Sequence, residues 1–196
     1  MVTRLLLLKH ATSTWNEAGL WQGSRDEPLS ESGRREAARA VAALTAHGVT
    51  RLACSDLKRA CKTAEILADG LKLPPPVIEK RLREYDAGQW EGLRRSQIEA
   101  RWPEALAAWR DGTLSVVPGG EDREGFLVRI LAGVRSIAEM CQGLPLIVTH
   151  GGVIEALTAR AGAAPLPMRS MSGRWFELED GAFHAGPQVD LGGVRA

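Results

Sequence analysis

Long apolar segments are missing from this sequence. The N-terminal apolar run, Leu5–Leu8, is short and is followed directly by Lys9 and His10. A secretory signal needs an apolar stretch of roughly 7–15 residues, and a membrane helix needs about 20. We therefore expect a protein that is neither secreted nor inserted in a membrane.

Cysteine is scarce. The chain has three cysteines, Cys54, Cys61 and Cys141, and no Cys-x-x-Cys spacing. This odd number favours reduced, buried thiols over a disulfide framework or a zinc site. It predicts a cytoplasmic protein.

Neither sign of charge is in excess. The 25 Lys and Arg residues are balanced by 24 Asp and Glu residues, which leaves a formal net charge of +1. A nucleic-acid-binding protein normally carries a basic excess or a basic stripe. We therefore expect no nucleic-acid partner.

Several standard catalytic motifs are also missing. The sequence contains no Gly-x-Gly-x-x-Gly, no Gly-x4-Gly-Lys, no His-Glu-x-x-His and no Gly-x-Ser-x-Gly. Dinucleotide binding, P-loop chemistry, zinc proteolysis and α/β-hydrolase chemistry therefore have no motif to support them.

The length and the apolar pattern predict one α/β domain over residues 1–196. The chain has 196 residues, of which 44% are apolar, and a domain typically takes roughly 100–200 residues. Short apolar runs alternate with longer helical patterns, which is typical of βαβ units. The predicted fold has three layers, α/β/α, with a mostly parallel sheet.

The apolar periodicity places the elements along the chain. Strands are expected at residues 4–9, 51–54, 77–78 and 146–149, with a hairpin over 174–184. Helices are expected at residues 30–47, 57–71, 126–137 and 151–161. Residues 83–92 are expected to form a loop. Residues 94–113 are expected to form a small helical cap, interrupted at Pro103.

Two of the four histidines directly follow expected strands. His10 comes after the strand at 4–9, and His150 comes after the strand at 146–149. In an open parallel sheet, ligands bind in the crevice beyond the carboxyl ends of the strands. Either histidine alone is more often a structural residue at a strand end, but the two together indicate a shared site.

Neighbouring residues indicate that this site binds phosphate. His150-Gly151-Gly152 leads from a strand into a helix, so its backbone N–H groups can meet an anion. Arg59 is expected in a first helical turn, where a guanidinium can bind a phosphoryl group, although a solvated helix arginine is the simpler alternative. Lys9 adds a second cation. Ser13 and Asn16 either donate hydrogen bonds to a ligand or serve a turn and a helix cap.

Six short motifs follow one another along nearly the whole chain. The first is Lys9-His10-Ala11-Thr12-Ser13-Thr14-Trp15-Asn16. The others are Gln22-Gly23 with Pro28-Leu29 and Gly33, Ser55-x-Leu57-x-Arg59-Ala60 with Thr63-Ala64, Leu82-Arg83-Glu84 with Gly88-Gln89-Trp90-Glu91-Gly92, Pro118-Gly119-Gly120-Glu121, and His150-Gly151-Gly152. In this order they resemble the motifs of the histidine phosphatase superfamily, which includes cofactor-dependent phosphoglycerate mutase and many small phosphatases.

The resemblance implies a phosphoglycerate mutase-like fold and a phosphatase that hydrolyses phosphate monoesters through a phosphohistidine. His10 would be the nucleophile, His150 would stabilise the transferring group, and Glu84 would protonate the leaving oxygen. Asp86 and Glu91 are rival carboxyls. The residues expected to bind substrate are Lys9, Ser13, Asn16, Gln22, Gly23, Arg59 and Gly151. The resemblance implies a phosphorylated small molecule as partner, with no cofactor and no metal.

Three positions depart from the family motif. Lys9 stands where the family has arginine, Ala11 where it has glycine, and Thr12 where it has a carboxamide or carboxylate. Lysine keeps the charge but loses the two-pronged donor geometry, and the Ala11 methyl adds bulk beside the nucleophile. A catalytically weak, phosphate-binding pseudo-enzyme therefore stays open as an alternative. The resemblance itself leaves open a second alternative, a phosphoglycerate mutase-type phosphoryl transferase. The short length favours the phosphatase over the mutase.

The six tryptophans divide into two groups. Trp15 and Trp90 lie beside site motifs and are expected to line the pocket, and Trp21 is near them in sequence. Trp102, Trp109 and Trp175 are expected to pack in the core or the cap.

Overall fold

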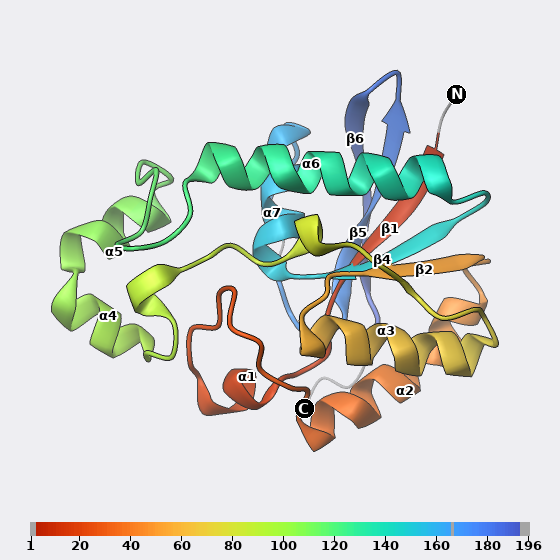
Figure 1. Cartoon of the computed structure of the whole chain (residues 1–196), viewed down its shortest axis with the longest axis horizontal. Helices are drawn as coiled ribbons and strands as arrows, with labels where there is room; N and C mark the ends of the chain where they lie inside the picture. The colour runs from red at the N-terminus through yellow and green to blue at the C-terminus, as the bar shows by residue number, and fades with distance from the viewer. Residues whose placement is uncertain (1–2, 166, 193–196) are drawn as a thin grey trace.

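A six-stranded sheet crosses the molecule, and helices cover both of its faces (Figure 1). The computed structural model describes residues 3–165 and 167–192. The strand order is β3-β2-β4-β1-β5-β6. The strands that pair in parallel are β1 (Thr3–Lys9), β2 (Arg51–Cys54), β3 (Val77–Ile78) and β4 (Pro145–Thr149). An antiparallel hairpin of β5 (Ser172–Glu179) and β6 (Ala182–Asp190) completes one edge, which confirms the predicted α/β fold with a mostly parallel sheet.

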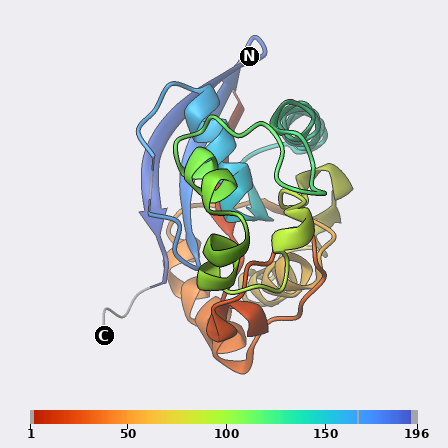
Figure 2. The same cartoon turned by 90° about the vertical axis from the view of Figure 1, so that its left-hand side faces the viewer.

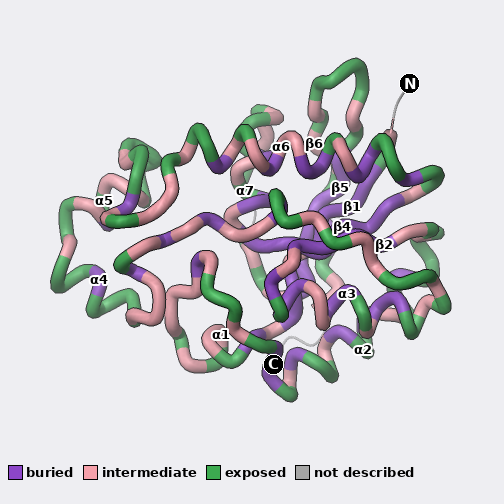
Figure 3. Tube along the Cα trace, viewed as in Figure 1, coloured by how far each residue is buried: buried purple, intermediate pink, exposed green. Residues whose placement is uncertain are grey.

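The helices form a layer on each side of the sheet. α2 (Glu31–Thr45) and α3 (Lys58–Leu71) pack together on the face that lies below the sheet in Figure 1. α6 (Arg123–Met140) and α7 (Gly151–Arg160) cover the opposite face. The buried stretches of the chain lie along the strands and on the sides of these helices that face the sheet (Figure 3).

The leucines of β1 show why the sheet has a core on each side. Successive side chains of a strand point to opposite faces. Leu5 and Leu7 pack with α6 and α7, whereas Leu6 and Leu8 pack with α2 and α3. A strand that is buried on both faces has an unbroken apolar sequence, as this one does.

The strand register brings the carboxyl ends of three strands to one level. Lys9 of β1 pairs with Thr149 of β4, and Cys54 of β2 pairs with Val148 of β4. The residues that follow these strands therefore lie side by side. His10 and His150 are the first residues after β1 and β4.

A pair of short helices lies beyond this edge, on the left in Figure 1 and toward the viewer in Figure 2. They are α4 (Arg95–Arg101) and α5 (Pro103–Arg110), and the break between them falls at the predicted proline. The proline occupies the first turn of α5, where its missing N–H costs no hydrogen bond. A cap function for this pair stays a prediction.

The structure differs from the sequence-based assignment in three places. Residues 83–92 are not entirely loop, because a 3-10 helix spans Gly88–Trp90 and another at Lys80–Leu82 precedes it. The helix α1 (Thr14–Ala18) was not predicted, because five residues are too few to show a helical period. The terminal hairpin is longer than predicted.

No helix among the described residues has the length and apolar character that crossing a bilayer requires.

Candidate active site

His10 is buried at the end of β1, with one ring nitrogen protonated and the other free to accept a hydrogen bond. Its Nδ1 lies 2.7 Å from the carbonyl oxygen of Ala11, and because a carbonyl only accepts, Nδ1 carries the proton. Nε2 therefore has the free electron pair, and it accepts a 3.1 Å hydrogen bond from Nε of Arg59. Burial, with Arg59 and Lys9 nearby, lowers the pKa of His10 well below its ordinary value.

His150 lies beside His10 at the end of β4. The two ring centroids are 5.3 Å apart, with an angle of 62° between the planes. Both ring nitrogens of His150 are buried, and neither has a hydrogen-bond partner among the residues that the structure describes. Because a buried polar atom without a partner is costly, this ring indicates a binding position for a polar or anionic ligand. Burial and the charge of Arg59 lower the pKa of His150 well below its ordinary value.

Arg59 is completely buried in the first turn of α3. Its Nη1 donates to the carbonyl of Arg25 at 2.5 Å and its Nη2 donates to the carbonyl of Gly23 at 2.8 Å. Burial lowers the pKa of Arg59 to about 10, so the guanidinium keeps its charge at neutral pH. The alternative of a solvated helix arginine is therefore wrong, and Arg59 links the loop before α2 to the ring of His10.

Glu84 is held by backbone N–H groups on both sides. Its Oε1 accepts from the N–H of Tyr85 at 2.9 Å, and its Oε2 accepts from the N–H of Gly152 at 3.1 Å. A Cβ on Gly152 would lie 2.4 Å from Glu84 Oε1, so only glycine leaves room for this carboxyl. The predicted residue Gly151 lines the pocket, whereas Gly152, which was not predicted, contacts the predicted acid.

The two rival carboxyls accept hydrogen bonds from backbone N–H groups outside the described pocket lining. Asp86 accepts a 2.9 Å hydrogen bond from the N–H of Gly88, and Glu91 accepts one of 2.6 Å from the N–H of Ser24. Glu84 is the member of this set that lines the pocket within the described part of the chain.

Ser13 lies behind the pocket wall rather than on it. It is completely buried, caps α1, and donates to Gln22 Oε1 at 2.7 Å. Its Oγ also accepts a 3.1 Å hydrogen bond from the N–H of Asn16. Ser13 therefore caps a helix, which was one of its two predicted roles, and a direct contact between Ser13 and substrate stays a prediction.

Lys9 lines the pocket with its ammonium group already bonded. Its Nζ donates to the carbonyl of Met168 at 2.9 Å. Burial lowers the pKa of Lys9, while the carboxylates of Glu84 and Glu155 act in the opposite direction. Lys9 therefore connects the segment before β5 to the edge of the sheet that carries His10.

The other two departures from the family motif face away from the pocket. Ala11 is completely buried in the core on the side of α2 and α3, and its N–H donates to Thr63 Oγ1 at 3.1 Å. Thr12 Oγ1 donates to Glu36 Oε2 at 3.0 Å and lies 3.0 Å from Ser170 Oγ. The added methyl group therefore occupies core space rather than the space next to the ring of His10.

A pocket of about 900 Å³ lies between the carboxyl ends of the strands and α4–α5, and neither His150 nor Ser13 is among the described residues that line it. The predicted site residues that line it are Lys9, His10, Asn16, Gln22, Gly23, Arg59, Glu84 and Gly151. Its outer walls are aromatic and basic, with Trp21, Tyr85, Trp109, Phe126, Arg95, Arg110, Arg123 and Arg160. A pocket with this charge distribution suits an anionic ligand whose body packs against aromatic rings.

The tryptophan prediction is wrong in part. Trp90 is completely buried, with its ring 5.5 Å from Trp21 and 5.9 Å from Trp109. Trp15 is a neighbour of Gly92 rather than part of the described pocket lining. The tryptophans that reach the pocket are Trp21 and Trp109, because Trp90 fills the layer beneath them.

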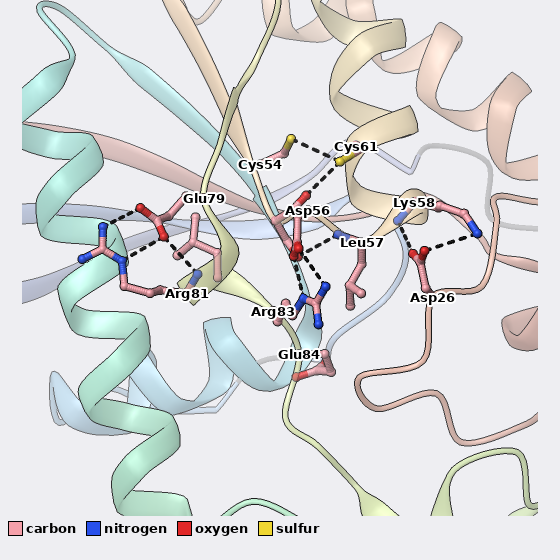
Figure 4. Close-up of polar contacts among 12 residues, drawn as sticks. Asp26, Cys54, Asp56, Leu57, Lys58, Cys61, Glu79, Arg81, Arg83 and Glu84 are labelled. Carbon is pink, nitrogen blue, oxygen red and sulfur yellow. Dashed lines mark hydrogen bonds and ion pairs between the residues drawn. The ribbon is translucent and has the colours of Figure 1, made fainter.

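Ion pairs link the loops around the site (Figure 4). Asp56, just after β2, accepts hydrogen bonds from both Nε and Nη2 of Arg83, each 2.7 Å long. Lys58 donates its backbone N–H to Asp26 at 2.6 Å, and its Nζ lies 3.3 Å from the same carboxylate. The segment that carries Glu84 is thereby joined to the loop that leads to Arg59.

The three cysteines are free thiols, as expected. Cys54 and Cys141 are buried, whereas Cys61 is only partly buried, which corrects the expectation for that residue. Across residues 3–165 and 167–192, no group of three or more His, Cys, Asp or Glu side chains is arranged to hold a metal ion.

Known proteins are similar to this chain in sequence and in fold. The family model for the histidine phosphatase superfamily (branch 1) matches residues 5–174. A glucosyl-3-phosphoglycerate phosphatase from Mycolicibacterium vanbaalenii is 34% identical over 173 residues, which cover 84% of this chain and 76% of that protein. The adenosylcobalamin/alpha-ribazole phosphatase of Salmonella typhimurium is 32% identical over 185 residues, or 93% and 89% of the two chains.

Solved structures of other proteins have a similar fold. A mycobacterial glucosyl-3-phosphoglycerate phosphatase superposes with a TM-score of 0.80 at 29% identity, over 94% of this chain and 97% of that one. A phosphoglycerate mutase from Bacillus anthracis has a TM-score of 0.84 at 23% identity, over 97% and 94% of the chains, and supports the fold alone. The chain belongs to branch 1 of the histidine phosphatase superfamily.

Proposed function

We propose that this protein is a phosphatase that hydrolyses phosphate monoesters through a phosphohistidine formed at Nε2 of His10. The observation that carries the proposal is the state of His10, whose proton lies on Nδ1 and whose Nε2 faces the guanidinium of Arg59. A neutral imidazole with a free electron pair beside a buried cation is suited to attack a phosphoryl group.

The first step transfers the phosphoryl group. Arg59 leaves Nε2 and binds the oxygens of the phosphoryl group together with Lys9, Asn16 and His150. The Nε2–P bond forms as the bond from phosphorus to the leaving oxygen breaks. Glu84, in its protonated form, gives its proton to that oxygen, so the alcohol departs neutral.

The second step releases phosphate. Water attacks the phosphorus of the phosphohistidine and the Nε2–P bond breaks, which returns His10 to its neutral form. The carboxylate of Glu84 takes the proton from the water and is ready for the next cycle. The proton that Glu84 gives to the alcohol is replaced by the proton that it takes from water, so Glu84 and His10 return to their starting forms. Neither step uses a metal.

The departures from the family motif do not favour a pseudo-enzyme. Ala11 and Thr12 are accommodated away from the pocket, and Lys9 keeps a cation at its lining. Relatives named as phosphatases, at 34% and 32% identity, support hydrolysis, and relatives named as probable phosphoglycerate mutases, at 29% and 34% identity, keep the mutase as the alternative. A cytoplasmic location stays a prediction.

The outer walls suggest the kind of leaving group. Four arginines line this part of the pocket against one further carboxylate, Glu155, and the aromatic side chains offer flat apolar surface. We expect a leaving group with a ring or apolar face and a second anionic group. Glucosyl-3-phosphoglycerate, named for the mycobacterial relatives, joins a sugar to an acid and is a first compound to test.

The nucleophile is tested by His10→Ala. Wild-type protein should turn over 4-nitrophenyl phosphate, and rapid quenching should trap an acid-labile, base-stable phosphoryl adduct on His10. His10→Ala should lose about 10³-fold or more in kcat, because the covalent route is gone. A variant that folds and keeps wild-type turnover contradicts the mechanism.

A further inference from the structure

Arg129 of α6 uses every N–H group of its guanidinium. Its Nε donates to Glu121 Oε1 at 2.6 Å and its Nη2 donates to Glu121 Oε2 at 2.8 Å. The other donations go to backbone carbonyls: Nη1 to Arg81 at 2.8 Å and to Arg83 at 2.7 Å, and Nη2 to Glu84 at 2.9 Å. One side chain thus fixes the backbone that leads into the predicted acid.

The chemistry of this arrangement requires arginine. A guanidinium offers five N–H donors in a rigid plane, whereas an ammonium offers three from a single point. The side chains of Arg129 and Glu121 are only 24% and 21% exposed, so water competes weakly for these bonds. The planar group therefore sets both the position and the direction of the carbonyls of Arg81, Arg83 and Glu84.

The partner of Arg129 is itself anchored on the far side of Glu84. The hydroxyl of Tyr85 donates to the carbonyl of Glu121. The N–H of Glu121 donates to the carbonyl of Asp86 at 3.0 Å. The Pro118–Glu121 turn and α6 therefore hold the backbone on either side of Glu84, while Gly152 holds its carboxyl.

We propose that Arg129, fixed by Glu121, is a positioning residue that orients the carboxyl of Glu84 toward the leaving oxygen. The inference rests on the proposed function, in which Glu84 is the proton donor. Displacing a catalytic group by about 1 Å can cost 10²-fold in rate, so the precision of this backbone segment matters for the reaction. It also gives the Pro118–Glu121 motif a role that the sequence analysis left unassigned.

The test compares two substrates that differ in their need for a proton. 4-Nitrophenolate leaves without protonation, whereas the alkoxide of glycerol phosphate needs a proton as it departs. Arg129→Lys should lower kcat/KM for glycerol phosphate by about tenfold to a hundredfold and change that for 4-nitrophenyl phosphate by less than about twofold. Glu121→Gln should act in the same direction with a smaller loss. Glu84→Gln should show the same selectivity for the alkyl ester.

The matched control is Arg135→Lys on the same helix. Arg135 is exposed and donates to the carbonyl of Gly181 at 2.9 Å. Arg135→Lys should leave kcat/KM unchanged for both glycerol phosphate and 4-nitrophenyl phosphate. Because Arg129 acts through Glu84, the double variant Glu84→Gln/Arg129→Lys should be no slower than Glu84→Gln alone. Thermal unfolding of each variant separates loss of fold from loss of rate.

The outcomes separate the two proposals. If wild-type protein hydrolyses neither ester, the proposed function is wrong. If wild type hydrolyses both, and Arg129→Lys and Glu121→Gln slow the two esters equally or not at all, the positioning role is wrong while the phosphatase assignment stands. Additive losses in the double variant also overturn the positioning role. If Arg129→Lys does not fold, Glu121→Gln provides the test: a selective loss for glycerol phosphate supports the positioning role, and an equal loss for both esters, or no loss, contradicts it.

Discussion

The inner and outer halves of the pocket are built differently. In the inner half, His10, Arg59 and Glu84 are tied by hydrogen bonds to β1, α3, α7 and the loops between them. In the outer half, Arg95 and Arg160 are exposed and, over residues 3–165 and 167–192, pair with no carboxylate. A fixed inner half suits one transferred group, because preorganised charges need no rearrangement during the reaction. An adaptable outer half suits recognition of a particular leaving group.

After the loss expected for His10→Ala, the largest expected effect distinguishes the two glycines at the start of α7. Gly152→Ala forces a Cβ to within 2.4 Å of Glu84 Oε1, so the carboxyl must move. We expect kcat/KM for an alkyl phosphate to fall about 10²-fold, the scale of general acid catalysis. The matched variant is Gly151→Ala, whose Cβ would meet nothing closer than 3.6 Å and whose loss should be several-fold smaller. Equal losses contradict the rigid placement of the acid.

A second prediction concerns the lysine at the inner edge. Lys9→Met should weaken inhibition by inorganic phosphate by about tenfold, because one charge-assisted hydrogen bond is lost. Lys9→Arg keeps the charge and should retain most of the phosphate affinity. Inhibition constants for the two variants decide the point. Unchanged inhibition in Lys9→Met means that Lys9 serves Met168 alone.

The smallest expected effect belongs to the outer wall. Arg95→Gln and Arg160→Gln should each raise KM about two- to fivefold for a phosphate ester with a second anionic group, since an exposed cation contributes little. KM for 4-nitrophenyl phosphate should stay constant. Arg39→Gln on α2, an exposed arginine away from the pocket, is the control. A shift that is equal for both esters shows that these arginines bind the transferred phosphoryl group instead.

The inner half was largely predictable from the sequence because it depends on strand ends. The unbroken leucine run marks β1 as buried on both faces, and the residue after such a strand reaches the ligand edge of the sheet. His10 and His150 could thus be placed together, although nearly 140 residues separate them. The motifs that follow β2 and precede Tyr85 placed Arg59 and Glu84.

The remaining contacts depend on how distant elements pack, which short motifs do not encode. Arg129 appears in the sequence as one more helix arginine, since its carbonyl partners lie more than 40 residues earlier in the chain. Trp90 adjoins a site motif yet fills the core, while Trp109 reaches the pocket from α5. The Gly152 contact follows from the path of the segment at Glu84 across the start of α7, which appears only in three dimensions.

The two buried histidines also connect folding to acidity. Both have pKa values well below the ordinary value of 6.5 because burial and nearby cations disfavour the charged ring. As pH falls below 6.5, the unfolded chain binds protons at these residues that the folded chain does not, so the free energy of unfolding decreases. The free energy of unfolding is therefore unaffected by these two histidines above pH 6.5, and it decreases as the pH falls below that value. A phosphate anion bound beside the rings stabilises their charged forms and therefore offsets part of that loss.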